Sequence, residues 1–312
     1  MSNMRDAVGL CMPYGEANGP YQTEFEPALG AVWASFNPQG IACYSPALLK
    51  AMIEHDRRLM ENGGRVDVDG EMQQVSYYIT RSRTPGVFNL GGDLSLFVLL
   101  IKAGDREALA QYAKLCIDVQ YPRSRSFFSP TLTSISLIQG DALGGGFECA
   151  LASDVIVAEE SAQLGFPEIL FNLFPGMGAY SLLSRRIGMR AAEELILSGR
   201  ILPAKKLHEM GVIDVLCRDG EGPTAVRTWI AENARHRNGL RAAHAARRRV
   251  NQVTREELDD ITNVWVDAAF RLGDRDLKMM GRIVRAQMRR MEQGDVIDVG
   301  AEALAEERAA VG

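Results

Sequence analysis

Two glutamates, Glu148 and Glu168, stand out because both lie in apolar surroundings. Glu148 directly follows Phe147, and Glu168 directly precedes Ile169. Burial disfavours the ionised form of a carboxyl group and raises its pKa. A pair of such groups can exchange protons near neutral pH and act as general acid and base. The competing interpretation is that each is an ordinary surface glutamate, which is the commoner situation for this residue type.

Two glycine-bearing segments, residues 88–94 and 140–148, offer a second kind of chemistry. The first reads F-N-L-G-G-D-L, and the second reads G-D-A-L-G-G-G-F-E. Each is expected between a strand and a helix, where unpaired backbone N–H groups can bind a negatively charged oxygen. Two such groups pointing at one oxygen would form an oxyanion hole. The alternative is that both segments are only tight turns, where glycine is common.

Composition and motifs exclude several functional classes. The glycine segments fit neither G-x-G-x-x-G nor G-x-x-x-x-G-K-[ST], so dinucleotides and nucleotide phosphates are not expected ligands. The five cysteines contain no C-x-x-C pair and the four histidines no H-E-x-x-H, so no metal site is expected. A net charge of −5 argues against a general nucleic-acid binder. No signal-peptide pattern is visible, and the longest apolar stretch, residues 94–101, is shorter than the about 20 residues that span a bilayer. These features predict a cytoplasmic protein that binds neither nucleic acid nor membrane.

The segments that must position the two glutamates alternate between strand and helix. Residues 21–36 are typical of two short strands broken near Pro27 and Gly30. Ser45 and Pro46 predict the start of a helix, and Gly63 and Gly64 predict its end. Further strands are expected at residues 75–80, 132–138 and 154–158, with a turn at 139–141, and further helices at 94–102, 105–119 and 142–152. From about residue 179 the chain is expected to be helical apart from 212–216, so the whole indicates a mixed α/β domain.

Four motifs in a fixed order make this interpretation more specific. They read F-x-x-G-G-D-L, I-x-G-x-A-L-G-G-G-x-E, A-Q-x-G-x-P-E-I and P-G-x-G, beginning at residues 88, 138, 162 and 175. Together they resemble the crotonase (enoyl-CoA hydratase/isomerase) superfamily over roughly residues 28–215. The resemblance implies an α/β fold, a crotonase-type spiral of β-β-α turns with a C-terminal helical region that builds trimers. The chain would then comprise an irregular N-terminal extension (1–22), a catalytic core (23–215) and a C-terminal helical region for oligomerisation and pocket closure (216–312).

The resemblance also assigns roles to residues. Gly92 and Gly145 would supply the N–H groups of the oxyanion hole, and Glu148 and Glu168 would be the catalytic pair. The substrate would be an acyl thioester on acyl carrier protein or coenzyme A, with no other cofactor and no metal. Because both acidic positions are filled, addition or removal of water across a 2,3 double bond is favoured. Either glutamate can take either proton-transfer role.

Departures from the commonest family pattern indicate one branch of it. Many members have a Lys-Ala-Phe-like run associated with the adenine of coenzyme A, whereas this chain has R-T-P-G-V-F at 83–88, followed by Asn89. With the N-terminal extension and the bulky residues 121–128, these features resemble the diffusible-signal-factor (DSF, RpfF-like) synthases of Gram-negative bacteria. That branch implies dehydration of a 3-hydroxyacyl thioester on acyl carrier protein to a cis-2-enoyl thioester, followed by thioester hydrolysis. The free cis-2-unsaturated fatty acid would be a quorum-sensing signal. An enoyl-CoA hydratase of fatty-acid oxidation and a non-catalytic crotonase-fold binding protein remain as alternatives.

Two further features concern substrate and partners. Residues expected to line an acyl pocket are Leu143, Leu170, Phe171, Phe174, Gly176, Met177 and Trp265, although apolar residues at such spacing are more often core or subunit contacts. Residues 235–249 contain six arginines and no acidic residue. They form either a solvated helix face or a docking patch for acidic acyl carrier protein or coenzyme A phosphates. The expected partners are the acyl carrier protein thioester, further copies of the chain in a trimer, and a signalling sensor protein.

Overall fold

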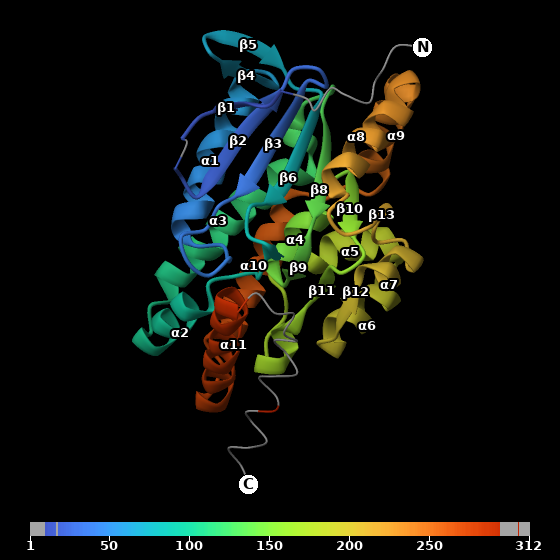
Figure 1. The fold of residues 1–312 in the computed structure, drawn as a ribbon. Helices are drawn as coiled ribbons and strands as arrows, with labels where there is room; N and C mark the ends of the chain where they lie inside the picture. Colours follow the sequence, from blue (N-terminus) through green and yellow to red (C-terminus); the bar gives the residue numbers. More distant parts are fainter. Residues whose placement is uncertain (1–9, 17, 294–304, 306–312) are drawn as a thin grey trace.

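The computed structural model describes residues 10–16, 18–293 and 305. A seven-stranded sheet runs through the upper half of the molecule in Figure 1. The strand order is β1-β2-β3-β6-β8-β10-β13. The first three strands are antiparallel, and every pair from β3 to β13 is parallel. β3 and β8 are buried along their whole length, as expected for parallel strands covered on both faces. The seven strands span Met12–Tyr14, Tyr21–Glu26, Ala31–Phe36, Tyr77–Ser82, Thr133–Ile138, Val155–Glu159 and Val215–Cys217.

A second sheet of four strands carries the residues of interest. Its order is β12-β11-β9-β7, and β7, β9 and β11 are parallel. Each of these three strands follows a strand of the large sheet, so β6-β7, β8-β9 and β10-β11 are successive turns of a spiral. Because parallel strands end at the same edge, the segments after β7, β9 and β11 are brought together. The four strands span Gly86–Asn89, Gly140–Leu143, Gln163–Gly165 and Ile201–Pro203.

Helices surround the two sheets and complete the repeating β-β-α turns. A separate hairpin of β4 (Arg65–Val68) and β5 (Glu71–Gln74) extends from one end of the molecule. The helices in the first half are α1 (Pro46–Glu61), α2 (Leu94–Ala103), α3 (Arg106–Ser124) and α4 (Gly145–Leu151), with 3-10 turns η1 (Ser126–Phe128) and η2 (Pro167–Phe171). Those in the second half are α5 (Ala179–Ile187), α6 (Met189–Ser198), α7 (Ala204–Glu209), α8 (Gly222–Asn233), α9 (Arg237–Val250), α10 (Arg255–Ala269) and α11 (Asp274–Gln293), with η3 (Ala234–His236).

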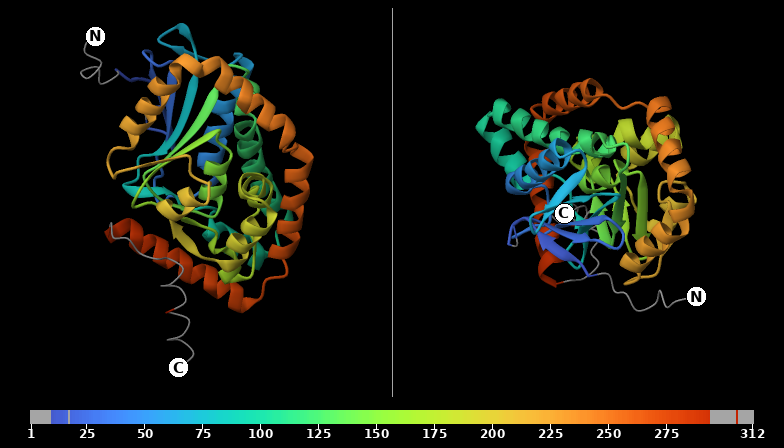
Figure 2. Two further views of the ribbon diagram at one scale, coloured as in Figure 1. Left: turned by 90° about the vertical axis from the view of Figure 1, so that its right-hand side faces the viewer. Right: turned by 90° about the horizontal axis from the view of Figure 1, so that it is seen from above.

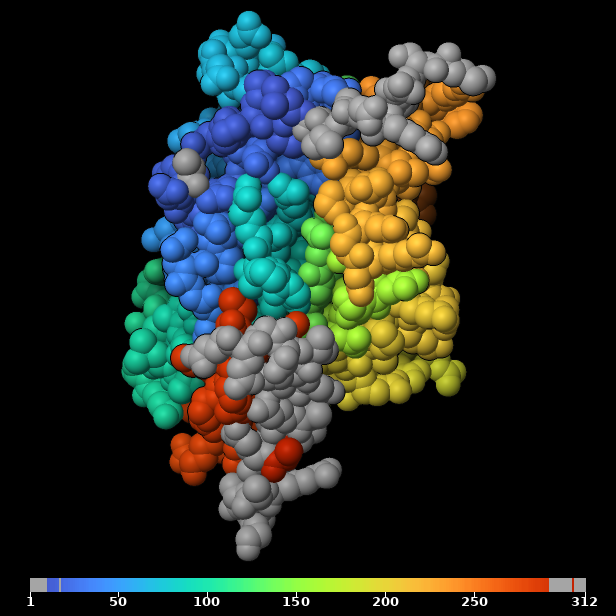
Figure 3. All heavy atoms as spheres, in the orientation of Figure 1, coloured from blue at the N-terminus to red at the C-terminus, as the bar shows by residue number. Residues whose placement is uncertain are grey.

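The last three helices form a belt around the core. Figure 2 shows α9, α10 and α11 running along successive sides of the molecule. α10 packs against α3, whereas α11 packs against α2 and η2. In the space-filling view, the surfaces of α11 and α2 adjoin (Figure 3). Both α2 and η2 follow strands of the small sheet, so α11 spans two of its strand ends.

Local signals explain where several elements begin and end. The Ser45 side chain accepts a hydrogen bond from the Leu48 N–H (3.2 Å) and starts α1, whose first residue is Pro46. Asp93 caps α2 in the same way, through the Leu96 N–H at 3.0 Å. α2 ends at Gly104 in a left-handed conformation, which glycine adopts without strain. The position of α2 immediately after residue 92 is therefore determined by its own cap.

The predicted α/β spiral with C-terminal helices is confirmed, with local corrections. The segment 1–22 was expected to be irregular, but residues 12–14 form β1 and pair with β2, while residues 1–9 lie outside the described part. Residues 139–141 were predicted as a turn, yet β9 begins at Gly140 and the following helix begins only at Gly145. The expected helix 105–119 extends to Ser124, through residues 121–124 of the bulky insertion. Among the mainly helical residues, β12 was not predicted, and it pairs with the edge strand β11.

Candidate active site

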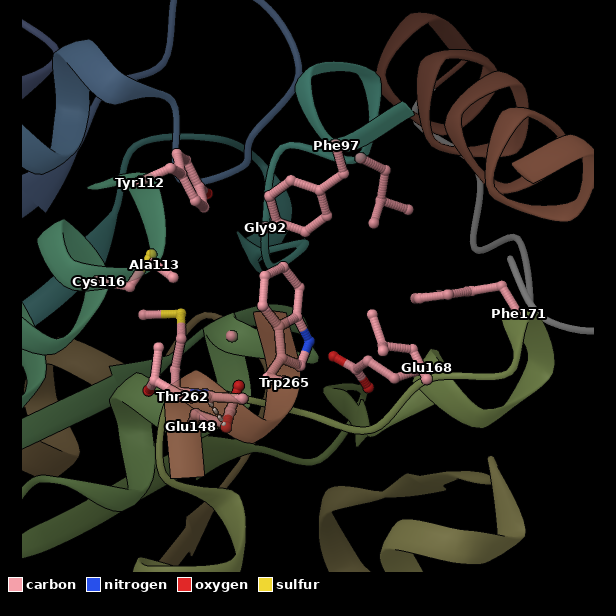
Figure 4. Close-up of a pocket in the computed structure, with 15 residues that line it drawn as sticks. Gly92, Phe97, Tyr112, Ala113, Cys116, Glu148, Glu168, Phe171, Thr262 and Trp265 are labelled. Atoms are coloured by element: carbon pink, nitrogen blue, oxygen red, sulfur yellow. Dashed lines mark hydrogen bonds between the residues drawn. The ribbon is translucent and has the colours of Figure 1, made fainter. Parts of the chain in front are cut away.

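A cavity at the carboxyl edge of the small sheet gathers residues from five helical elements and two loops (Figure 4). It comprises about 490 Å³ of space not filled by protein atoms, part of which is open to solvent. Its walls are mostly apolar and surround two carboxyl groups. Its lining residues are Gly92, Leu94, Phe97, Tyr112, Ala113, Cys116, Gly145, Glu148, Glu168, Phe171, Leu173, Gly176, Met177, Thr262 and Trp265.

Gly92 and Gly145, the two glycines expected to bind an oxyanion, both line this cavity. Their loops touch, because a Cβ placed on Gly91 would lie 3.1 Å from the Gly145 nitrogen. Gly91 has φ +94°, a conformation that favours glycine. Gly145 is the first residue of α4, so its N–H has no acceptor within that helix. The arrangement places two backbone N–H donors beside one apolar space.

Bonds to its neighbours fix the loop that carries Gly92. The Asn89 side chain accepts from the Gly91 N–H at 2.8 Å, and the Tyr44 N–H donates to the Gly91 carbonyl at 2.8 Å. The Asp93 N–H donates to the Tyr112 hydroxyl at 3.2 Å. Within the described part of the chain, the Gly92 N–H itself forms no such bond. That N–H is left to a ligand.

Glu148 is held by the backbone of the segment that precedes α5. Its Oε1 accepts hydrogen bonds from the Met177 N–H at 2.7 Å and from the Ala179 N–H at 2.8 Å. The Gln120 side chain donates to the Glu148 carbonyl at 2.5 Å and fixes the first turn of α4. Burial raises the pKa of Glu148 to about 8, and the two N–H donors act in the opposite direction. A carboxyl group with this pKa changes its charge close to neutral pH.

Glu168 reaches the cavity from η2 and lies close to the backbone of the neighbouring loop. A Cβ on Gly144 would lie 2.2 Å from Glu168 Oε1, so the carboxyl group fits only because residue 144 is glycine. Its Oε2 is buried and has no hydrogen-bond partner among the described residues. Burial, together with the nearby charge of Glu148, raises the pKa of Glu168 well above its usual value. The sequence-based expectation that both glutamates occupy apolar surroundings is thus confirmed.

The two carboxyl groups influence each other's ionisation, since the charge of Glu148 adds to the effect of burial on the pKa of Glu168. Like charges at close range disfavour double ionisation, so one member of such a pair stays protonated when the other ionises. Glu148 ionises first, since its Oε1 has two N–H donors and faces the N-terminus of α5. One carboxylate and one carboxylic acid beside two N–H donors can carry out proton transfer next to a polarised carbonyl group.

Trp265 of α10 forms the centre of the apolar wall. Its side chain lines the cavity together with Glu148 and Glu168, and in the view of Figure 4 it is drawn between them. The ring packs edge-on against Phe97, with 5.1 Å between centroids. A Cβ on Gly176 would lie 2.5 Å from the Trp265 Cγ, so glycine permits this approach. The C-terminal helical region therefore contributes Thr262 and Trp265 to the cavity wall.

Four of the seven residues expected to line an acyl pocket are found there: Phe171, Gly176, Met177 and Trp265. The other three were wrong. Leu143 is a buried core residue of β9, Leu170 lines a separate hollow between η2 and α11, and Phe174 packs against Tyr180 instead. Residues missed from the sequence are Leu94, Phe97, Tyr112, Ala113, Cys116, Leu173 and Thr262. A signal existed in Ala113 and Cys116, which are small residues within the otherwise bulky apolar pattern of α3.

The arginine-rich segment 235–249 does not border this cavity. Arg247 and Arg248 bind the buried carboxylate of Asp154, at 3.3 and 2.5 Å. Although burial opposes ionisation, Arg248 and His244 hold the pKa of Asp154 below its usual value. Two of the six arginines thus attach α9 to the core, and Arg235 and Arg249 are exposed. In the part of the chain that the structure describes, no cluster of three or more potential metal ligands occurs.

The family model that matches this chain and the related proteins below point to the same family. The family model for enoyl-CoA hydratase/isomerase matches residues 72–264. Mitochondrial methylglutaconyl-CoA hydratase from Homo sapiens is 32% identical over 207 residues, which cover 65% of this chain and 58% of that protein. The peroxisomal fatty acid beta-oxidation multifunctional protein MFP2 from Arabidopsis thaliana is 34% identical over 144 residues, covering 46% of this chain and 19% of that protein. The chain therefore spans between a fifth and three fifths of the length of these relatives.

Solved structures share the fold at low sequence identity. An enoyl-CoA hydratase/isomerase from Xanthobacter autotrophicus Py2 superimposes with a TM-score of 0.67 at 19% identity, covering 89% of this chain and 97% of the other. DspI from Pseudomonas aeruginosa gives a TM-score of 0.60 at 22% identity, with 85% and 94% covered. These likenesses establish the architecture and extend it over nearly the whole chain.

Proposed function

Since the chain belongs to the enoyl-CoA hydratase/isomerase family, we propose that it removes water from 3-hydroxyacyl thioesters and adds it to 2-enoyl thioesters. The observation that carries the proposal is the cavity that Glu148, Glu168, Gly92 and Gly145 share. The thioester carbonyl lies between the two glycine N–H groups. Negative charge grows on its oxygen as the α-proton leaves, and both donors stabilise that charge.

Proton balance in this reaction matches the state of the pair. The ionised glutamate takes the α-proton, and the electrons of the C–H bond form the 2,3 double bond. The bond from C3 to the hydroxyl oxygen breaks, and the protonated glutamate supplies the proton with which water leaves. After one turnover the shared proton has moved from one carboxyl group to the other. Hydration is the same sequence in reverse.

We further propose that the product is a free cis-2-unsaturated fatty acid made from an acyl carrier protein thioester. In the hydrolytic step a glutamate removes a proton from water, and the resulting hydroxide attacks the thioester carbonyl. The tetrahedral oxyanion accepts hydrogen bonds from the same two N–H groups, and its collapse expels the thiolate, which takes up the proton from the glutamate. One site therefore serves both an enolate and a tetrahedral intermediate.

Preference for a carrier protein over coenzyme A is supported by the segment before Gly92. In many family members the run that corresponds to residues 83–88 is associated with the adenine of coenzyme A. Here Arg83 pairs with Glu24 at 3.1 Å, and the Gly86 carbonyl accepts a hydrogen bond from Arg290 of α11 at 3.0 Å. Groups that would meet a nucleotide are thus engaged within the chain.

The test is to incubate the purified protein with 3-hydroxydodecanoyl thioesters on acyl carrier protein and on coenzyme A, and to follow products by mass spectrometry. Release of a free cis-2-enoic acid from the carrier-protein thioester is the expected result. Hydration of a trans-2-enoyl-CoA without release of acid would overturn the hydrolytic part and support the enoyl-CoA hydratase alternative, which the names of the relatives favour. An unchanged phenotype of cells that carry Glu148→Ala or Glu168→Ala, with the fold intact, would favour the non-catalytic alternative.

Partners and location follow from the same proposal. Besides acyl carrier protein, they are two further copies of the chain in a trimer and a signalling sensor protein. Light scattering on the purified protein measures the first assembly, and a monomer would refute it. No helix within the described residues is long and apolar enough to cross a membrane. A cytoplasmic location stays a prediction.

A further inference from the structure

The last described helix, α11, contacts the elements that follow both functional strand ends. It packs against α2, which starts directly after Gly92 and Asp93, and against η2, which contains Glu168. Two polar side chains on its inner side, Gln287 and Arg290, are each only 3% exposed. Burying them costs free energy unless they are paired, so their partners indicate what the helix holds.

Gln287 binds the loop that carries the first oxyanion donor. Its Nε2 donates to the carbonyl oxygen of Leu90 at 3.3 Å, two residues before Gly92. At the same residue, the Leu90 N–H donates to the Ala42 carbonyl at 2.7 Å. Gly91 follows at φ +94° and has no side chain, so packing cannot fix the direction of the next N–H. The hydrogen bonds on Leu90 and Gly91 must do so.

Arg290 binds the strands that carry both donors. Its Nε lies 3.2 Å from Asp141 Oδ2 in β9, and its Nη2 donates to the Gly86 carbonyl in β7 at 3.0 Å. The backbones of β7 and β9 also approach each other closely here, since a Cβ on Gly140 would lie 2.0 Å from the Gly86 carbonyl carbon. β7 leads to Gly92 and β9 leads to Gly145. One guanidinium group therefore bridges the two strands whose ends form the oxyanion hole.

We propose that Gln287 and Arg290 are positioning residues that aim the Gly92 N–H at the thioester oxygen and set its separation from the Gly145 N–H. Neither side chain lines the cavity, so both act through the loops. The inference rests on the proposed function only in taking the ligand to be an acyl thioester. A purely structural role for α11 would instead change stability and leave carbonyl polarisation as it is.

The experiment compares Gln287→Met with Met288→Gln. The first keeps side-chain length and removes the donor, and the second makes the opposite exchange at the next residue, which is 46% exposed. The spectroscopic probe is the hexa-2,4-dienoyl thioester of pantetheine, which lacks the nucleotide, because an oxyanion hole that polarises its carbonyl shifts the ultraviolet absorption of the conjugated thioester to longer wavelength. For Gln287→Met we expect a smaller shift, kcat lowered about tenfold and KM changed less than about twofold, as losing one aimed donor completely costs about 10²–10³. Met288→Gln should match the unaltered protein.

Arg290→Met and Arg290→Lys provide the second measurement. Arg290→Met should lose most of the shift, and Arg290→Lys should recover part of it, because lysine keeps the charge near Asp141 but not the second bond to Gly86. If Arg290→Met does not fold, Arg290→Lys and Gln287→Met decide the matter. An unchanged shift and kcat in both folded variants would overturn the inference.

Failure of the proposed function is distinguishable from failure of the inference. A protein that binds the probe with a shifted spectrum but turns over no 3-hydroxyacyl thioester would refute the function alone, and the variants would still be judged on the shift. Absence of any shift in the unaltered protein, with the probe bound, would overturn the inference.

Discussion

Hydrogen-bond donors and exposure both distinguish the two cavity glutamates, because Glu148 is buried and Glu168 is partly exposed. Glu148 Oε1 receives two backbone N–H groups, whereas Glu168 Oε2 receives none from the described residues. Both lie in a medium that disfavours charge, so the donors decide which group ionises first. Glutamine at either position keeps the shape but removes the proton-transfer group, which makes it the informative replacement.

Glu148→Gln and Glu168→Gln should each lower the dehydration rate at saturating substrate by about 10²–10⁴, the range typical of a lost general acid or base. Spectrophotometry of enoyl-thioester formation measures the rate, and circular dichroism checks the fold. Glu160→Gln is the matched control, because Glu160 is exposed. Retention of more than half the rate by both cavity variants would contradict their assignment.

The raised pKa of Glu168 also makes the stability of the protein depend on pH. The pKa of Glu168 is raised in the folded protein above the value of 4.5 for an unperturbed group, so the folded state binds more protons than the unfolded state. Stability from this group is complete below pH 4.5 and is lost as pH rises through the folded pKa. Glu168→Gln removes this pH-dependent loss of stability, because glutamine does not ionise. The melting temperature of the variant relative to the unaltered protein should therefore increase between pH 5 and pH 8, and a constant difference would refute the raised pKa.

At the scale of elements, the close approach of η2 to the start of α4 depends on a missing side chain. Gly144 has φ +49°, and any Cβ there would overlap Glu168 Oε1. The proximity of the two glutamates is thus a property of two segments, not of either residue alone. An alanine at this position would also destabilise the backbone because of the positive φ, so a control with the same φ but no overlap is needed.

Gly144→Ala should displace Glu168 and lower the dehydration rate at least as much as Glu168→Gln does. Gly104→Ala is the control, because Gly104 has a similar φ of +69° and nothing within 4 Å of its added Cβ. Thermal unfolding should show a comparable backbone cost for both, and only Gly144→Ala should lose activity. Equal activity in the two variants would show that Glu168 is free to move aside.

The sequence predicts those features of the site that depend on neighbouring residues in the chain. Ordered motifs located Gly92, Gly145, Glu148 and Glu168, because the three motifs that contain them lie at the ends of β7, β9 and β11, the parallel strands of the small sheet. Leu170 and Phe174 were placed wrongly, since spacing within a 3-10 turn and an irregular segment does not say which side faces a cavity. Phe97, Tyr112 and Thr262 were missed because only the packing of α2, α3 and α10 against one another brings them to the cavity. The role of α11 was equally inaccessible, as Arg290 and Asp141 are 149 residues apart.

At the scale of the whole molecule, buried charges join parts that are distant in sequence. Asp154 binds Arg247 and Arg248 of α9, and it accepts a hydrogen bond from Ser126 at 2.6 Å. Asp56 of α1 pairs with Arg123 of α3, with side-chain exposures of 1% and 4%. Arg123 also donates to the Tyr21 hydroxyl of β2 at 2.9 Å. The second group joins α1, α3 and the antiparallel end of the large sheet, away from the cavity.

Removal of one partner from such a pair leaves an uncompensated charge in the interior, at a cost of about 3–5 kcal/mol, whereas removal of both partners costs much less. Arg123→Met should therefore lower the free energy of unfolding by about that amount, and Asp56→Leu combined with Arg123→Met should recover a large part of it. Urea denaturation of both variants measures these values. Because the group does not touch the cavity, the dehydration rate per folded molecule should stay within about twofold of that of the unaltered protein. Additive losses in the double variant would mean that packing of the Arg123 side chain on Tyr21, Tyr78 and Phe127, rather than its charge, holds these elements together.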